Sequence, residues 1–267
     1  MYPELLNLGF LHVHTYGVCM AAGFLLCWHL IERLTGRRDL SSLLVILMLA
    51  GVTGSRAAYV IEHWSEEFAT EPLAVFSVWN GGLMFYGGLL LAIAAFFAWC
   101  FWRRERPLEL ADVLTAVIPL GHACGRIGCF FYGCCYGRRS DAVLAVAFPR
   151  RSAAWCEQVA KGLIPSTADA SLPVLPTQLF EAAALLVLFA VLLTVYRRLY
   201  AAPAEDRRRG CVVGSYLIGY AFIRYGLEFL RGDPRAQVGP FSISQFISLL
   251  MMAAGLGLLF FARRRKS

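Results

Sequence analysis

The chain has 267 residues, of which 58% are hydrophobic and only 16% are charged, and its mean hydropathy is +0.59. This composition excludes an ordinary soluble domain, and several apolar runs approach the roughly 20 residues that a helix needs to cross about 30 Å of hydrocarbon. The net charge of +7 does not indicate a nucleic-acid partner, because the basic residues form short blocks beside the apolar runs. We therefore predict an all-α polytopic membrane protein, with residues 1–267 forming a single transmembrane domain.

Seven transmembrane helices are predicted, separated by polar or proline-containing segments. The segment at about 128–177 is too long for a tight turn and too polar to cross a membrane, so we expect an ordered loop or cap on one side. The spans are expected at about 13–31, 41–61, 81–102, 111–127, 178–196, 211–230 and 241–262.

The distribution of basic residues indicates the orientation of these helices. The segments joining the spans on one side, together with the C-terminal tail, carry 15 Lys and Arg residues, whereas the 62–80 segment has none and contains four glutamates. Cytoplasmic loops carry the excess of Lys and Arg, so we expect the N-terminus outside and the C-terminus in the cytoplasm. In a bacterium this places the protein in the inner (plasma) membrane, with the 128–177 segment in the periplasm.

The stretch from Gly121 to Asp141, GHACGRIGCFFYGCCYGRRSD, contains an arginine at the end of an apolar helix. A guanidinium at this depth is costly unless an anionic group pairs with it, so Arg126 marks a candidate functional site. His122 lies one turn earlier and can project from the same helix face. A buried core histidine and a catalytic base are both compatible with this position.

A second arginine occurs in GYAFIRYGLEFLRGDPRAQ, within the sixth predicted span. Tyr220, Arg224 and Glu228 are spaced by four residues and Arg231 follows three later, which places them near one helix face. One interpretation is a structural Arg224–Glu228 pair. The other is a site for an anionic head group, because arginine binds phosphate in a bidentate manner.

Three further side chains near span ends, those of Arg56, Tyr86 and Tyr16, each have a structural and a functional interpretation. We expect Arg56 to have mainly a structural role, pairing with Glu62 or Glu66. Tyr86 lies between the glycine pairs at 81–82 and 87–88, which let another backbone or a lipid chain come close. Tyrosines at span ends also belong to the aromatic belt of many membrane proteins, and this alternative applies to Tyr86 and to Tyr16.

Five of the nine cysteines cluster in or near the predicted exterior loop: Cys124, Cys129, Cys134, Cys135 and Cys156. An oxidising compartment favours a disulfide among them, while packing and a reactive thiol remain alternatives. The C-x4-CC spacing is not a common zinc pattern, so no metal site is predicted.

Taken together, these stretches resemble the prolipoprotein diacylglyceryl transferase family, enzymes of bacterial lipoprotein maturation in the inner membrane. The resemblance extends over most of the chain and depends on the order and spacing of several motifs. These are Tyr16-Gly17, G-x-x-x-x-R-x-x-Y at 51–59, GG-x-x-x-x-GG at 81–88, GRIG at 125–128, PTQLFE at 176–181, R-x-x-x-E-F-x-R at 224–231 with the following D-P-R-A-Q, and S-x-x-Q-x-x-S at 242–248.

The resemblance implies transfer of a diacylglyceryl group from phosphatidylglycerol to the lipobox cysteine of a preprolipoprotein, without a metal or another cofactor. It implies that Arg126 and Arg224 hold the phosphate and that Glu228 positions Arg224. The substrate-binding residues that it implies are Tyr16, Arg126, Arg224, Arg231, Gly87, Gly88 and Gln178.

The chain departs from the family pattern at three positions. Tyr86 occupies the place of a histidine, Cys129 that of an asparagine and Cys134 that of a glutamate. His122, Tyr86 and Tyr220 are therefore the candidates for accepting the thiol proton. The alternative functions are a non-catalytic phospholipid-binding or lipid-translocating protein, and a transferase for another acceptor.

Overall fold

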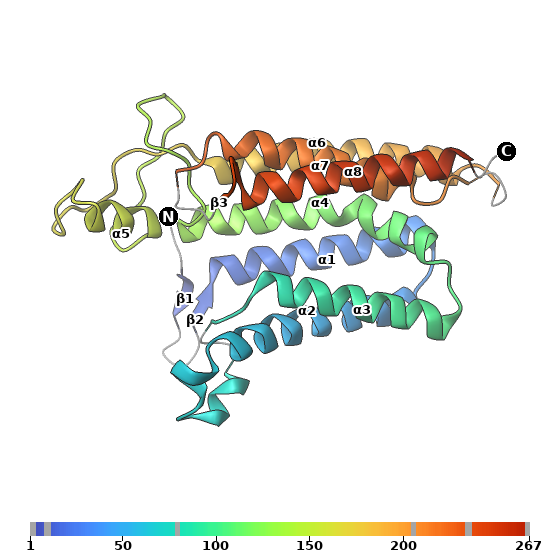
Figure 1. Ribbon diagram of the computed structural model, residues 1–267, viewed down its shortest axis with the longest axis horizontal. Helices are drawn as coiled ribbons and strands as arrows, with labels where there is room; N and C mark the ends of the chain where they lie inside the picture. The colour runs from blue at the N-terminus through green and yellow to red at the C-terminus, as the bar shows by residue number, and fades with distance from the viewer. Residues whose placement is uncertain (1–3, 8–11, 78–80, 204–206, 233–236, 265–267) are drawn as a thin grey trace. The chain divides into compact units, whose positions relative to one another are not determined.

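The computed structural model describes the chain except for residues 1–3, 8–11, 78–80, 204–206, 233–236 and 265–267 (Figure 1). Most of the D-P-R-A-Q motif therefore lies outside the described residues. Two short antiparallel hairpins occur, one between β1 (Glu4–Asn7) and β2 (His12–His14) and one between β3 (Gln237–Val238) and β4 (Phe241–Ser242). The α-helices of the described part are α1 (Thr15–Thr35), α2 (Leu40–Glu62), α3 (Phe85–Arg103), α4 (Pro107–Tyr132), α5 (Ala153–Ala160), α6 (Thr177–Tyr200), α7 (Cys211–Glu228) and α8 (Ile243–Arg264).

Six helices in the described part are long and apolar enough to cross a membrane: α1, α2, α3, α4, α6 and, over Ile243–Ala262, α8. The prediction of an all-α polytopic membrane protein is confirmed. The sixth predicted span, at about 211–230, coincides with the 18-residue helix α7, which is not among these six. Helix α4 continues beyond the predicted end of its span to Tyr132, because the chain leaves the helical conformation only at Gly133, where φ is +80°. The count of seven spans and their orientation remain predictions.

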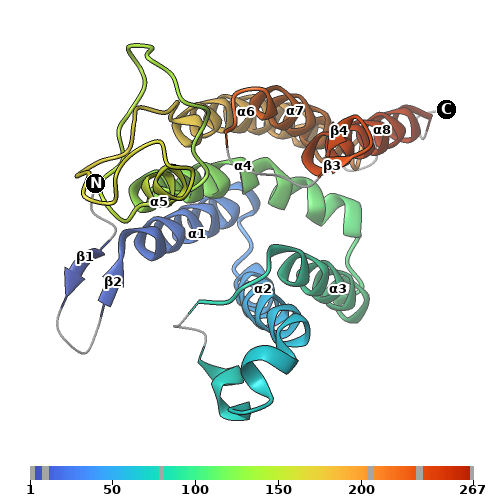
Figure 2. The ribbon, with the colours of Figure 1, turned by 60° about the vertical axis from the view of Figure 1, so that its left-hand side comes forward.

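The described chain forms two compact units, which comprise residues 1–31 with 111–267 and residues 32–110. In the first unit, α7 packs against α6 and α8 (Figures 1 and 2). Helices α1 and α4 approach closely at Gly23, where a Cβ atom would lie 2.8 Å from the Cys124 Cβ and 3.2 Å from the Gly121 carbonyl oxygen. The absence of a side chain at Gly23 therefore permits this helix contact.

In the second unit, α2 and α3 pack together through their glycines. A Cβ atom on Gly54 would lie 2.5 Å from the Gly87 carbonyl oxygen, and one on Gly88 would lie 2.5 Å from the Gly51 carbonyl oxygen. Of the two glycine pairs expected to admit a backbone or a lipid chain, the pair at 87–88 thus admits the backbone of α2. This contact explains why small residues occupy both helices.

Arg56 organises the chain between α2 and α3. The side chain is buried, and its guanidinium donates hydrogen bonds to the carbonyl oxygens of Ala74, Val75, Gly81 and Gly82 at 2.6–3.2 Å. The expected structural role is found, but its partners are these carbonyl groups rather than the carboxylates of nearby glutamates. A guanidinium carries five N–H donors, so it can satisfy several carbonyls at once.

Asp112 of α4 satisfies the N-terminus of α7. Its carboxylate is 0% exposed and accepts hydrogen bonds from the backbone N–H groups of Gly210, Val212 and Val213 at 2.7–3.1 Å, and from the Tyr200 hydroxyl at 3.1 Å. The first N–H groups of a helix have no partner within the helix, and a carboxylate also complements the helix dipole. This aspartate therefore fixes the start of α7 relative to α4.

We predict that Asp112→Ala lowers the free energy of unfolding by at least about 2 kcal/mol, because several buried donors lose their acceptor. Asp112→Asn should have a smaller effect, since one of its two side-chain oxygens is retained. Thermal unfolding of the purified protein in detergent measures both effects, with the exposed Asp169→Asn as the control. An Asp112→Ala protein that unfolds at the wild-type temperature would contradict this account.

Candidate functional site

The site is built around an ion pair between two apolar helices of the first unit. An Arg126 Nη2 on α4 lies 3.0 Å from a Glu181 Oε1 on α6, and the two side chains are 18% and 1% exposed. A charge in an apolar environment requires a counter-charge, and Glu181 supplies it. The Arg126 Nε–H group is buried and has no hydrogen-bond acceptor among the described residues. This donor is available to an anionic ligand.

His122 and Tyr220 stand beside this ion pair. The His122 Nε2 lies 3.8 Å from the same Glu181 oxygen, which confirms that His122 and Arg126 project from one face of α4. The His122 ring centroid lies 5.3 Å from that of Tyr220 on α7. The Tyr220 hydroxyl lies within hydrogen-bonding reach of Arg126.

Three members of the predicted row, Tyr220, Arg224 and Glu228, lie on α7, whereas Arg231 lies beyond the helix end and forms an isolated β-bridge with Gly137. An Arg224 Nη2 lies 2.9 Å from a Glu228 Oε2 and donates a 2.7 Å hydrogen bond to the Ser244 hydroxyl on α8. His122 and Tyr220 each lie within electrostatic range of both Arg126 and Arg224. The two arginines predicted to act together therefore both lie near His122 and Tyr220.

Cys129 in the last turn of α4 and Cys134 and Cys135 in the turn that follows form what we call the thiol cluster. Their three sulfur atoms lie within 4.8 Å of one another. No disulfide forms among the nine cysteines, all of which lie in the described part, so the disulfide alternative is not borne out. Hydrogen bonds with the Cys129 and Cys134 thiols, and then with the Arg231 guanidinium, hold the pKa of Cys135 well below its usual range.

Two predicted substrate-binding residues lie at this end of α4. Tyr16 on α1 packs against Gly128, where a Cβ atom would lie 3.0 Å from the tyrosine ring. The Gln178 side chain donates a 2.6 Å hydrogen bond to the Cys134 carbonyl oxygen, and its own Oε1 is buried without a partner among the described residues. Gln178 therefore supports the turn after α4, which its predicted role did not include.

Two residues in this arrangement, Glu181 and Ser244, are not among the site residues predicted from the sequence. Glu181 belongs to PTQLFE, and a carboxylate in the first turns of an apolar 24-residue helix was the signal that could have identified it. Ser244 carries no comparable signal, because serine is common at helix starts. Its contact with Arg224 depends on how α8 packs against α7.

Comparison with known proteins gives a match over almost the whole chain. The model of the family described as prolipoprotein diacylglyceryl transferase matches residues 3–261. The chain belongs to this family.

Several relatives carry the name phosphatidylglycerol–prolipoprotein diacylglyceryl transferase. The protein from Methylibium petroleiphilum is 33% identical, and the alignment covers 98% of this chain and 97% of the relative. Those from Paracidovorax citrulli and Cupriavidus pinatubonensis are 32% and 30% identical, and the alignments cover 99% of this chain and 98% and 92% of the relatives.

The departures from the diacylglyceryl transferase pattern are distributed unevenly in space. Cys129 and Cys134, which stand where the pattern has asparagine and glutamate, belong to the same thiol cluster. Tyr86 lies in the second unit, in the first turn of α3, and is 56% exposed with its ring against Phe85. Such exposure is typical of an aromatic-belt residue, and the predicted catalytic role of Tyr86 stays a prediction.

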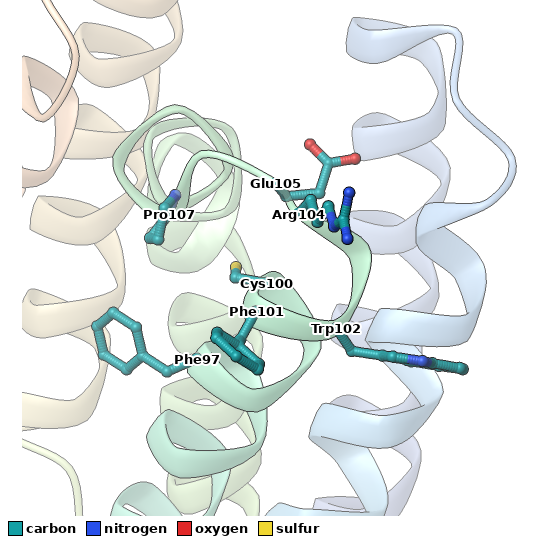
Figure 3. Close-up of a pocket in the computed structure, with 7 residues that line it drawn as sticks. All are labelled: Phe97, Cys100, Phe101, Trp102, Arg104, Glu105 and Pro107. Atoms are coloured by element: carbon teal, nitrogen blue, oxygen red, sulfur yellow. The ribbon is translucent and has the colours of Figure 1, made fainter.

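The second unit also contains a surface hollow of about 810 Å³ (Figure 3). It lies at the turn between α3 and α4, and Phe97 and Trp102 extend from α3 in opposite directions. Phe101 is 89% exposed. Exposed aromatic rings at a helix end are typical of a membrane interface, and we assign no reaction to this hollow.

The buried pair leads to a stability prediction. Glu181→Leu leaves the Arg126 guanidinium without its carboxylate and should destabilise the protein by about 3–5 kcal/mol. Replacing both residues, by Arg126→Met with Glu181→Leu, should recover most of this loss, because no unpaired charge remains. Unfolding in detergent measures both variants, and Lys161→Met, which breaks an exposed ion pair, is the control. Equal stability of Glu181→Leu and wild type would contradict the proposed partnership.

Proposed function

We propose that this protein transfers the diacylglyceryl group of phosphatidylglycerol to the lipobox cysteine thiol of preprolipoproteins. The reaction forms a thioether and releases glycerol phosphate. The observation that carries the proposal is the family match over residues 3–261. The convergence of Arg126, Arg224, His122 and Tyr220 supports it, because a phosphate leaving group requires cations that stabilise developing negative charge.

Arg126 and Arg224 are assigned to the phosphate. Each guanidinium contacts one carboxylate, Glu181 or Glu228, so the charges cancel before the lipid arrives. A guanidinium has five N–H groups, and one ion pair leaves several of them able to donate. The phosphodiester can therefore bind while the carboxylates continue to hold the arginines in place.

The remaining assignments concern the two substrates. His122, Tyr220 and Tyr86 are the candidates for accepting the thiol proton from the acceptor. Tyr16 and Arg231 lie near the thiol cluster and are assigned to substrate binding, as are Gln178, Gly87 and Gly88. Membrane lipids provide the donor, and the acceptor is a lipobox-containing preprolipoprotein.

We further propose that the protein lies in the bacterial inner membrane, with seven spans, the site facing the periplasm and the C-terminus in the cytoplasm. The distribution of Lys and Arg supports this orientation. In the first unit, the 133–176 segment and the end of α8 lie at opposite ends (Figure 1). This arrangement is compatible with a periplasmic cap over residues 128–177 and a cytoplasmic C-terminus.

The transfer reaction can be measured directly. Purified protein is incubated with phosphatidylglycerol and a lipobox peptide, and the peptide mass should increase by one diacylglyceryl group through a thioether. Arg126→Ala and Arg224→Ala should each lower the rate by about 10²–10³-fold, because each removes a group that stabilises the leaving phosphate. The exposed Arg208→Ala, on the predicted cytoplasmic side, should retain the wild-type rate.

Three outcomes would contradict the proposal or part of it. Full activity of both arginine variants would show that Arg126 and Arg224 do not take part in the reaction. Binding of phosphatidylglycerol without any product would favour the lipid-binding or lipid-translocating alternative. The three departures from the family pattern are the reason for considering this alternative. Transfer to another acceptor in the same assay would identify a transferase of different specificity.

A further inference from the structure

The thiol cluster is formed by a turn after α4 that brings Cys134 and Cys135 back toward Cys129. Cys129 lies in the last turn of α4, which ends at Tyr132, and the N–H groups of Gly133 and Cys134 both donate to the Cys129 carbonyl oxygen. Gly133 and Cys135 have positive φ angles of +80° and +62°, which fold the chain back toward the helix end. The three sulfur atoms of Cys129, Cys134 and Cys135 therefore meet, although their spacing in the sequence is unusual for a metal site.

The first turn of α6 holds this arrangement in place. The Thr177 hydroxyl donates a 2.9 Å hydrogen bond to the Cys135 carbonyl oxygen, and the Gln178 amide bonds the Cys134 carbonyl oxygen at 2.6 Å. Both of these α6 side chains are buried, whereas the three cysteines are only half-buried. The cluster is thus fixed from the interior and accessible from outside, as a site that receives a ligand must be.

The geometry suits a thiophilic divalent cation. With Zn–S bonds of about 2.3 Å, thiolates at tetrahedral corners lie about 3.8 Å apart, which is compatible with sulfur atoms that all lie within 4.8 Å. Three thiolates and one divalent cation leave a net negative charge. Arg231, which hydrogen-bonds Cys135, and Arg126, which lies within electrostatic range of Cys129 and Cys135, offset that charge.

Three protein ligands are one fewer than a structural zinc site contains and leave one coordination position open. We propose that the thiol cluster binds Zn²⁺ or a similar thiophilic cation, and that the open position takes the acceptor's cysteine thiol. This inference rests on the proposed transferase function. It assigns thiol activation to Cys129, Cys134 and Cys135. Two of these residues are departures from the family pattern, and the chain also has tyrosine at the position of the family histidine.

The chemical step balances without an oxidant or a reductant. A thiol that coordinates the cation loses its proton to solvent and becomes a thiolate. Its sulfur attacks the glyceryl carbon that carries the phosphate, so that a C–S bond forms and the C–O bond breaks. The electron pair of the C–O bond moves to the phosphate oxygen, next to Arg126 and Arg224, and glycerol phosphate leaves.

Metal binding can be tested with Co²⁺ as a spectroscopic probe. Reduced, chelator-treated protein in detergent should bind one Co²⁺ per chain, with sulfur-to-metal charge-transfer absorption, and Zn²⁺ should displace it. Serine substitutions at Cys129, Cys134 and Cys135 should each weaken binding by about 100-fold or more. Cys156→Ser, which alters an exposed cysteine in α5, should bind as the wild type does.

Two results of this experiment would overturn the metal proposal. One is the absence of charge-transfer absorption at Co²⁺ concentrations that saturate ordinary trithiolate sites. The other is a disulfide between two members of the cluster in protein isolated without reductant, detected by mass spectrometry of the alkylated peptides. A disulfide would show that the same close approach of sulfurs serves oxidation instead.

The role of the open position has its own measurement. A lipobox peptide should change the Co²⁺ charge-transfer band, whereas the same peptide with serine in place of cysteine should not. Metal-free protein should transfer at least about 100-fold more slowly than Zn²⁺-loaded protein, whereas His122→Asn and Tyr220→Phe should have smaller effects. Comparable activity of the metal-free protein would overturn the metal proposal and leave the transferase function intact.

Failure of the transferase function gives a different pattern. If neither form of the protein transfers a diacylglyceryl group but the cysteine peptide still changes the Co²⁺ spectrum, the proposed reaction is wrong. The thiol-binding metal site is then supported by itself. If the spectrum responds equally to the cysteine and serine peptides, the open position does not receive the acceptor thiol and the inference fails.

Discussion

The central constraint in this protein is the cost of placing an arginine inside an apolar helix bundle. Arg126 is stabilised there because Glu181 reaches it from α6, almost completely removed from solvent. The pair links two helices and leaves other guanidinium N–H groups available for an anion. His122 approaches the same carboxylate, and Tyr220 lies within reach of the same arginine, so one ion pair arranges the surrounding polar side chains.

Helix α4 connects this constraint to the rest of the first unit. Asp112 satisfies the N-terminus of α7 near one end of the helix, and Arg126 pairs with α6 nearer the other. The position of α7 in turn determines where Arg224 lies, and α8 contributes Ser244 to that arginine. Buried charges on a single helix thus set the positions of its neighbours, because each requires a partner at hydrogen-bonding distance.

The proposed reaction has two requirements, the departure of a phosphate and the activation of a thiol. The arginines that suit the first requirement match the family pattern. The residues that differ from the pattern include Cys129 and Cys134, which the fold places together with Cys135 and close to Arg126. Two of the three departures therefore lie together where the second requirement would be met, which is consistent with a changed route for the thiol proton.

The sequence by itself determined the features that depend on nearby residues. Apolar run length gave the helices, and the helical repeat placed His122 with Arg126 and Arg224 with Glu228, because both are local properties of one helix. Only the tertiary structure decided that Glu181 meets Arg126, and that the three thiols converge. Such contacts depend on helix packing and on backbone turns with positive φ. These bring together groups whose closeness cannot be read from their spacing in the sequence.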